Sequence, residues 1–172
     1  MRRSGVLLVF GTSAALAWSG CSIQERTDRN RSDDDADAAS TRRQIIRPEG
    51  VARLPVFSSA VRSGDLIFLS GSLGAVPGVS PPRLVEGGID AETRQTMENI
   101  IVVLDAAGAT LEDLVKCTVF LADIDDYAAM NAVYLEYFPV DPPARSAVAG
   151  SGLALGALVE IECIAAVPEG ME

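Results

Sequence analysis

Residues 47–172 contain several short β-rich runs but only two stretches of helical periodicity, and this imbalance constrains the fold more than any other feature. The first stretch begins near Asp90, which can cap a helix, and ends before Gly108. The second extends from about Asp126 to Phe138 and is followed by prolines. Because two helices are too few to follow every strand of a sheet, the pattern predicts an α+β domain.

Alternating apolar and polar residues predict a hairpin near the start of this domain. Val56–Val61 and Leu66–Ser70 are its two strands, and Ser63–Asp65 is the tight turn between them. Gly71–Gly88 is rich in Gly and Pro, so we expect a loop there. Val115–Leu121 is rich in β-branched and apolar residues and is expected to form a central strand.

Two further extended runs follow the second helix, Arg145–Ala149 and Leu158–Val167. They are separated by the short segment Gly150–Gly156 and one further residue, and so short a connection predicts antiparallel pairing. That register would place Arg145 opposite Glu160 across the sheet. The expected order is ββαβαββ, with both helices on one face of a mixed sheet.

Arg145 follows the stiff segment Pro142-Pro143-Ala144 where a loop enters a strand, and such junctions often hold ligand groups. Its planar guanidinium suits a carboxylate ligand better than a lysine would. A cross-strand ion pair with Glu160 explains the same pattern, and Glu162 is expected on the same face as Glu160. The residues alone therefore leave a ligand site and an ion pair both open.

Residues 1–21 have the order of an export signal. Arg2 and Arg3 precede an apolar stretch from Val6 to Trp18, which is shorter than the ~20 residues that a membrane-spanning helix needs. Cys21 after Ser-Gly resembles the lipidated cysteine of a bacterial lipobox, although Trp18 departs from that motif. We expect an exported bacterial protein, periplasmic or in the cell envelope, with a lipid on Cys21. The alternative is ordinary cleavage and a soluble exported product.

Residues 22–46 are polar and charge-mixed and have no apolar period, which predicts a flexible tether before the domain at 47–172. The domain carries seven Lys or Arg side chains against eighteen Asp or Glu, a balance that disfavours nucleic-acid binding. The chain contains no histidine, which makes catalytic triads and zinc sites poor hypotheses. Cys117 and Cys163 lie in β-rich runs and are interpreted as small buried apolar residues rather than a disulfide framework.

Several segments, taken in order, are similar to the RidA/YjgF family of reactive-intermediate deaminases, and the resemblance covers nearly all of residues 50–167. The most specific match is the ending, where Pro143-Ala144-Arg145-Ser146 precedes Val159-Glu160-Ile161-Glu162-Cys163-Ile164-Ala165. The other matching segments are Val56-Phe57-Ser58-Ser59-Ala60, Phe68-Leu69-Ser70-Gly71, Thr96-Met97-Glu98-Asn99-Ile100, Lys116-Cys117-Thr118-Val119-Phe120-Leu121 and Met130-Asn131-Ala132-Val133-Tyr134.

The resemblance implies a fold like the small chorismate mutases, a homotrimer, and three clefts at the subunit boundaries. It further implies that Arg145 grips the carboxylate of a small substrate and that Glu160 holds or activates water. The implied reaction is the hydrolysis of an enamine or imine acid such as 2-aminoacrylate to a 2-oxo acid and ammonia, without metal or cofactor.

Four further positions follow from the same resemblance. Ser70 and Asn131 match pocket positions of the family, although each side chain could instead bond local backbone. Phe57 replaces a tyrosine usual in the family's site, and Ala147 stands where many members have cysteine. A trimer that binds a small ligand or acts as a scaffold without turnover is the alternative function, and the ribonuclease activity attached to the family's name is least compatible with the acidic charge.

Overall fold

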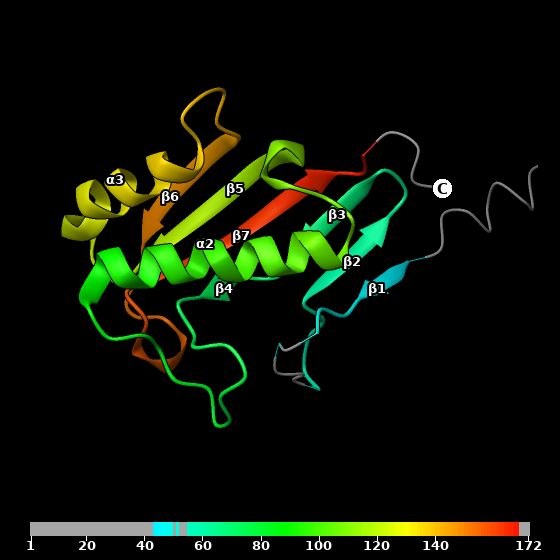
Figure 1. Ribbon diagram of the computed structural model, residues 1–172. Coiled ribbons are helices and arrows are strands. Elements are labelled where there is room, and N and C mark those ends of the chain that lie inside the picture. The colour runs from blue at the N-terminus through cyan, green and yellow to red at the C-terminus, as the bar shows by residue number, and fades with distance from the viewer. Residues whose placement is uncertain (1–42, 50, 52–54, 169–172) are drawn as a thin grey trace, which may run out of the picture. The chain divides into compact units, whose positions relative to one another are not determined.

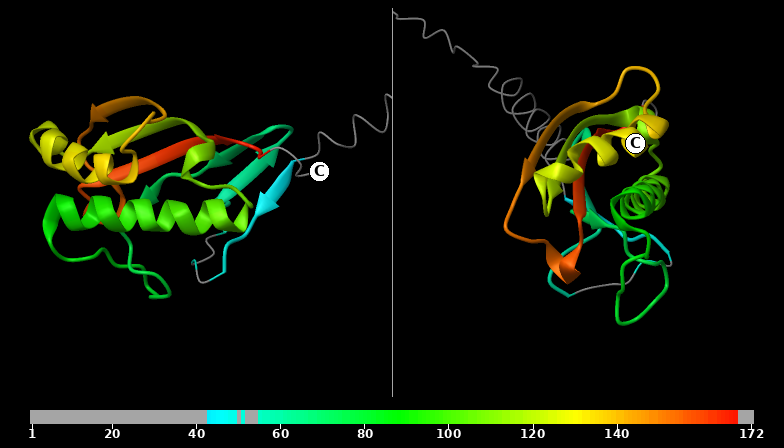
Figure 2. Two further views of the ribbon diagram at one scale, coloured as in Figure 1. Left: turned by 45° about the horizontal axis from the view of Figure 1, so that its top comes forward. Right: turned by 90° about the vertical axis from the view of Figure 1, so that its left-hand side faces the viewer.

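The computed structural model describes residues 43–49, 51 and 55–168. Within them, a mixed sheet of seven strands is covered on one face by two helices (Figure 1). The end-on view in Figure 2 places both helices on the same side of the sheet. The predicted α+β architecture is therefore confirmed.

The helices and strands follow the predicted order, with two short strands added. The strands are β1 (Gln44–Ile46), β2 (Ala60–Ser63), β3 (Leu66–Leu69), β4 (Ser72–Leu73), β5 (Leu114–Leu121), β6 (Ala144–Ala149) and β7 (Val159–Ala166). The helices are α2 (Gly88–Ala106) and α3 (Tyr127–Tyr137), and single 3₁₀ turns lie at Leu111–Asp113, Ile124–Asp126 and Ala154–Gly156.

The first predicted hairpin is present as the antiparallel pair β2 and β3, with Ala60 opposite Leu69. Its first strand is shorter than predicted, because Val56 and Phe57 precede it as exposed residues. Strand β1 pairs with β2 on the outer side, with Gln44 opposite Arg62. The sheet thus begins three residues inside the segment predicted to be a tether, so the boundary at 47 was placed too late.

Helix α2 begins and ends at glycines that adopt positive φ angles. It starts after Gly87, where φ is 122°, so Asp90 lies in the first turn rather than capping the helix. A carboxylate in the first turn still interacts favourably with the helix dipole. Gly108, with φ of 70°, follows the last turn. Between these ends, the predicted apolar stripe is buried against the sheet at Met97, Ile100 and Leu104.

The sheet order is β1-β2-β3-β7-β5-β6, which differs from the prediction for the last two strands. Strand β6 pairs only with β5, to which it is parallel, and β7 lies on the other side of β5 in antiparallel orientation. The connection between β6 and β7 passes around the end of β5: Gly150 N–H donates to the Leu121 carbonyl, and Ala122 N–H donates to the Leu158 carbonyl. A short connection therefore joins two strands that are not neighbours.

This register overturns the predicted pairing of Arg145 with Glu160. Arg145 lies opposite Cys117 of β5, whereas Glu160 lies opposite Phe120. Because successive residues of a strand point to opposite faces, Arg145 projects on the face covered by the helices and Glu160 on the open face. No hydrogen bond or ion pair joins the two side chains within the described residues.

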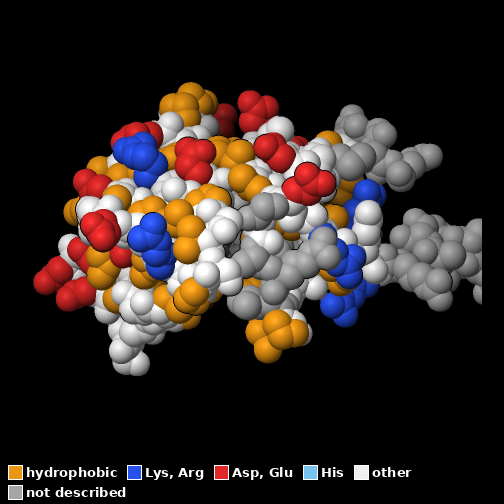
Figure 3. All heavy atoms as spheres, turned by 60° about the horizontal axis from the view of Figure 1, so that its bottom comes forward, with side chains coloured by type: hydrophobic (Ala, Val, Ile, Leu, Met, Phe, Trp, Pro, Cys, Tyr) orange, Lys and Arg blue, Asp and Glu red, His pale blue; other side chains and the backbone are white. Residues whose placement is uncertain are grey.

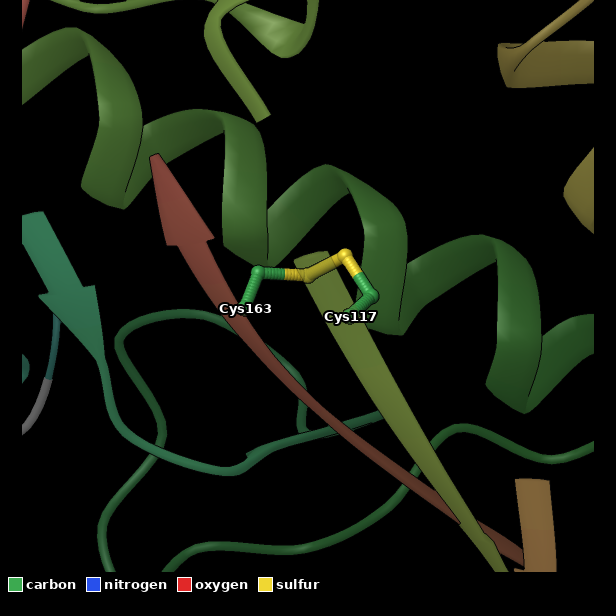
Figure 4. Close-up of a disulfide and its surroundings, with 2 residues drawn as sticks. All are labelled: Cys117 and Cys163. Carbon is green, nitrogen blue, oxygen red and sulfur yellow. A yellow bond between two sulfur atoms is a disulfide. The ribbon is translucent and has the colours of Figure 1, made fainter. Parts of the chain in front are cut away.

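Cys117 and Cys163 are buried, as predicted, but they form a disulfide, which was not predicted. They lie opposite each other on β5 and β7, with their Cα atoms 4.1 Å apart. Figure 4 shows the bond between the two strands and beneath α2. It links the two central strands of the sheet through residues 46 positions apart.

The other face of the sheet carries apolar side chains that no described element covers. Phe68 of β3 is 43% exposed and Val148 of β6 is 49% exposed. On the molecular face drawn in Figure 3, acidic and apolar side chains are interspersed, and the basic ones do not merge into a stripe. Among the described residues, no helix is long and apolar enough to cross a membrane.

Candidate active site

Arg145 emerges from the edge strand β6 beside α3 and has uncharged partners. Its guanidinium carbon lies 4.7 Å from the centre of the Tyr134 ring and 5.8 Å from that of Tyr127, distances at which a cation is attracted to an aromatic face. Its Nη2 donates a hydrogen bond of 3.3 Å to the Tyr127 hydroxyl. Within the described residues it forms no ion pair with a carboxylate. The charge is therefore available to an anionic ligand.

The partners of Arg145 form one stripe on α3. Tyr127, Asn131 and Tyr134 occupy positions i, i+4 and i+7, which share one face of a helix. Tyr134 is only 3% exposed and its ring packs on Phe138, whereas Tyr127 is 40% exposed. The stripe thus has a buried end that supports the guanidinium and an open end that borders it.

The two tyrosines differ in their electrostatic environment. Hydrogen bonds from Asn131 and then Arg145, together with the Arg145 charge, hold the pKa of Tyr127 below its usual value of 10. Burial raises the pKa of Tyr134 to about 12, although the nearby Arg145 charge acts in the opposite direction. The Tyr134 hydroxyl and the Asn131 Oδ1 atom are buried without a hydrogen-bond partner among the described residues.

Glu160 lies on the open face of β7 and belongs to a second group of residues. Its carboxylate rests against Gly71, where a Cβ atom would overlap it. Strand β4 fixes this approach, because Leu73 pairs with Glu160 and Ser72 with Ile161. Desolvation by burial, and then the charge of Glu162, raise the pKa of Glu160 above its usual value. A half-buried carboxyl with a raised pKa is suited to accept and return a proton.

Ser70 precedes Gly71 of this second group, and a hydrogen bond links it to the segment that contains Phe57 and Ser58. The Ser70 hydroxyl donates a 2.7 Å hydrogen bond to the Ser58 carbonyl, so its function in the described structure is to hold the segment before β2. Phe57 precedes that carbonyl and is 52% exposed. Ser70 therefore adopts the backbone-bonding alternative, and Phe57 presents an apolar ring without a hydroxyl.

The predicted site residues are thus divided between two groups. Arg145 and Asn131 lie with Tyr127 and Tyr134 beside α3 and can bind and orient an anion. Glu160 lies on the opposite face with Gly71 and can exchange a proton with water. Within the described residues, no group of three or more His, Cys, Asp or Glu could hold a metal ion.

Comparison with known families assigns the chain. Residues 49–167 match the family described as Endoribonuclease L-PSP, which includes the RidA and YjgF proteins. The chain belongs to this family. The resemblance inferred from the motifs is confirmed, and the region 49–167 is a RidA-family domain.

Relatives of known activity and structure support the same assignment. The chain is 42% identical over 124 residues to the 2-iminobutanoate/2-iminopropanoate deaminase of Capra hircus, covering 72% of this chain and 89% of that protein. RidA from the Antarctic bacterium Psychrobacter has a TM-score of 0.67 and 37% identity, covering 72% of this chain and 99% of that one. TdcF of E. coli, solved with bound serine, has a TM-score of 0.66 and 28% identity, covering 73% and 99%.

Two tyrosines of the RidA-family domain contact Arg145 and were not among the candidate site residues of the sequence. Tyr134 ends the matching segment Met130–Tyr134 and is buried, and its ring lies beneath the Arg145 guanidinium. Tyr127 is partly exposed beside that group. The spacing of Tyr127, Asn131 and Tyr134 was a usable signal for the site. Asn131 matches a pocket position of the family, and residues at this spacing lie on the same face of a helix.

Proposed function

We propose that this RidA-family domain hydrolyses small enamine and imine acids to 2-oxo acids and ammonia. The observation that carries the proposal is the Arg145 guanidinium, which stacks on Tyr134 and meets no carboxylate among the described residues. A guanidinium held in this way can bind a substrate carboxylate through two parallel hydrogen bonds. The names of the goat deaminase and of the serine-bound TdcF structure agree with a small ligand of this class.

The chemistry requires one water molecule and no redox step. An enamine such as 2-aminoacrylate tautomerises to 2-iminopropanoate, water adds to the carbon of the C=N bond, and the resulting carbinolamine expels ammonia to leave pyruvate. Glu160, with its raised pKa, can accept a proton from the attacking water and return it to the departing nitrogen. Arg145 fixes the carboxylate and thereby the position of the reacting carbon.

A homotrimer is part of the proposal because the two groups of residues do not meet within one chain. Arg145 and Glu160 project on opposite faces of the sheet. A neighbouring copy packed on the open face can bring its own Arg145 group to Glu160 of the first. The uncovered apolar residues Phe68 and Val148 support such packing, since large exposed apolar patches mark protein interfaces.

The test is the release of pyruvate from 2-aminoacrylate formed in situ by a serine dehydratase. We expect the wild-type protein to accelerate pyruvate release, and Arg145→Ala to reduce kcat/KM by about 100-fold, because hydrogen bonds to charged groups contribute about 1.5–3 kcal/mol each. Wild-type protein that leaves the rate unchanged would contradict the proposal. A fully active Arg145→Ala variant would remove the assignment of carboxylate binding.

A second candidate function is a trimer that binds a small ligand without turnover. Phe57 favours this alternative function. Its exposed ring precedes Ser58, whose carbonyl accepts the Ser70 hydrogen bond, and it provides no hydroxyl there. Tight binding of pyruvate without imine hydrolysis would identify this case. Ribonuclease activity, which the family description names, is disfavoured by the net charge of −10, since nucleic-acid affinity depends on basic side chains.

We further propose that the protein is exported and carries a lipid on Cys21, in the periplasm or cell envelope. Cys21 and the signal-like segment lie outside the described residues. The Cys117–Cys163 disulfide supports export, because disulfides persist in oxidising compartments and are rare in reducing ones. Mass spectrometry of the mature N-terminus tests the proposal, and a chain that still begins at Met1 with free thiols would contradict it.

A further inference from the structure

We propose that Tyr127 is a substrate-binding residue whose phenol donates a hydrogen bond to the carboxylate that Arg145 holds. The inference rests on the proposed function for the assignment of Arg145, and it adds a second donor to that site. Nothing in the motifs pointed to this residue, which lies one turn of α3 before Asn131.

The first step is the direction of the Tyr127 hydroxyl. Its oxygen accepts a hydrogen bond from Arg145 Nη2 at 3.3 Å. The buried Asn131 Oδ1 atom has no partner among the described residues, so the Tyr127 O–H group does not donate to it. A phenol oxygen that accepts a hydrogen bond from Arg145 keeps its own O–H free to donate elsewhere.

The second step is the position of that free donor. The Tyr134 ring, 4.7 Å from the guanidinium carbon, supports one face of Arg145, and Tyr127 borders its edge. Tyr127 is 40% exposed, so its ring and hydroxyl are open to a ligand approaching the guanidinium. The N–H groups that Arg145 does not use and the Tyr127 O–H therefore converge on the same anion. A carboxylate, with two oxygens that accept hydrogen bonds, matches this arrangement.

The third step excludes the other tyrosines, all of which lie on α3. Tyr134 is 3% exposed, and its hydroxyl is buried away from solvent. Tyr137 faces α2, where its hydroxyl donates to Glu98 Oε1 at 2.8 Å and lies 3.3 Å from the Arg94 carbonyl. Tyr127 is the one tyrosine whose phenol is both accessible and next to Arg145.

The experiment measures pyruvate binding by calorimetry and imine hydrolysis by steady-state kinetics, in the full-length protein. Tyr127→Phe removes the hydroxyl and keeps the ring. We expect the Kd for pyruvate to rise about tenfold, since one hydrogen bond to a charged group is lost, and KM to rise with kcat within about twofold. Tyr137→Phe removes a hydroxyl from the same helix and should leave both constants unchanged.

The outcomes separate this inference from the proposed function. A crystal structure with pyruvate should place the Tyr127 oxygen about 2.5–3.0 Å from a carboxylate oxygen. Pyruvate affinity unchanged by Tyr127→Phe, or absent from the wild type at millimolar concentration, overturns the inference. If the wild type binds pyruvate through Tyr127 but hydrolyses no imine, the proposed function fails and the binding assignment stands.

Discussion

Arg94 and Arg145 have contrasting partners although both contact α3. Arg94 forms a two-pronged ion pair with Glu136, with N–O distances of 2.6 and 2.9 Å, and this carboxylate raises the Arg94 pKa. Arg145 instead contacts two tyrosines and one phenolic oxygen. A guanidinium that is paired with a carboxylate has its charge neutralised and its N–H donors occupied. One that is held by aromatic rings keeps its charge for an anionic ligand.

Gly71 is a residue whose lack of a side chain determines where Glu160 lies. Because a Cβ atom at this position would overlap the end of the Glu160 side chain, Gly71→Ala should displace the carboxylate while leaving the fold intact. We expect kcat to fall on the order of 100-fold, since misplacement of a catalytic group by about 1 Å costs this much. Imine hydrolysis and the melting temperature of the variant check the prediction.

Gly150→Ala is the matched control, because a Cβ atom there meets no heavy atom within 4 Å. It should retain wild-type activity. A Gly71→Ala variant with full activity would show that Glu160 does not need this position.

At the scale of elements, β7 carries both carboxylates of the open face. Glu160 and Glu162 are two residues apart and therefore point to the same side of the strand. Burial is the larger cause of the raised Glu160 pKa, and the Glu162 charge is the smaller one. Burial of Glu160 on β7 therefore disfavours its ionised form, and the charge of Glu162 disfavours it further.

The pH profile of kcat/KM tests this arrangement. If Glu160 acts as a base, activity falls as the pH decreases through its raised pKa. Glu162→Gln removes a like charge, lowers the Glu160 pKa and should move the acidic limb to lower pH. The limb should remain above the usual glutamate value, because burial persists. An acidic limb that stays in place, or moves to higher pH, would contradict the assigned cause.

The helices and strands were predictable from local sequence patterns, but which strands pair with each other was not. The apolar stripe of α2 and the β-rich run of β5 are properties of adjacent residues, and both were found. The pairing of β6 was predicted from loop length alone, which favours hairpins. Strand β5, apolar enough to be central, needed a partner on each side, and it separates β6 from β7. This competition between strands is a property of the whole sheet.

The same distinction holds for the site. Motifs indicated Arg145, Asn131 and Glu160 as candidate residues. They did not indicate that Arg145 and Glu160 lie on two different faces, because the face of each side chain depends on how β5, β6 and β7 pair. Tyr127 was missed because its importance comes from a contact with a strand 18 residues away. The disulfide was missed for the same reason, since Cys117 and Cys163 meet only once β5 and β7 are paired.

At the scale of the whole molecule, the proposed site residues of one chain lie in two separate groups. The Arg145 group lies at an edge strand on the helical side, and the Glu160 group lies on the open side. A closed oligomer in which each copy presents one group to each neighbour would complete every site, and a ring of three copies would hold three of them. The buried disulfide ties together the two central strands that support both groups.

The most direct test of this account is complementation between two inactive variants. Arg145→Ala and Glu160→Gln, each alone, should show imine hydrolysis reduced about 100-fold or more. Mixed trimers formed by co-expression should regain about one quarter of wild-type activity, because one cleft in four combines the intact arginine of one copy with the intact glutamate of its neighbour. Mixed oligomers that remain as inactive as their parents would show that the two residues do not act together across a subunit boundary.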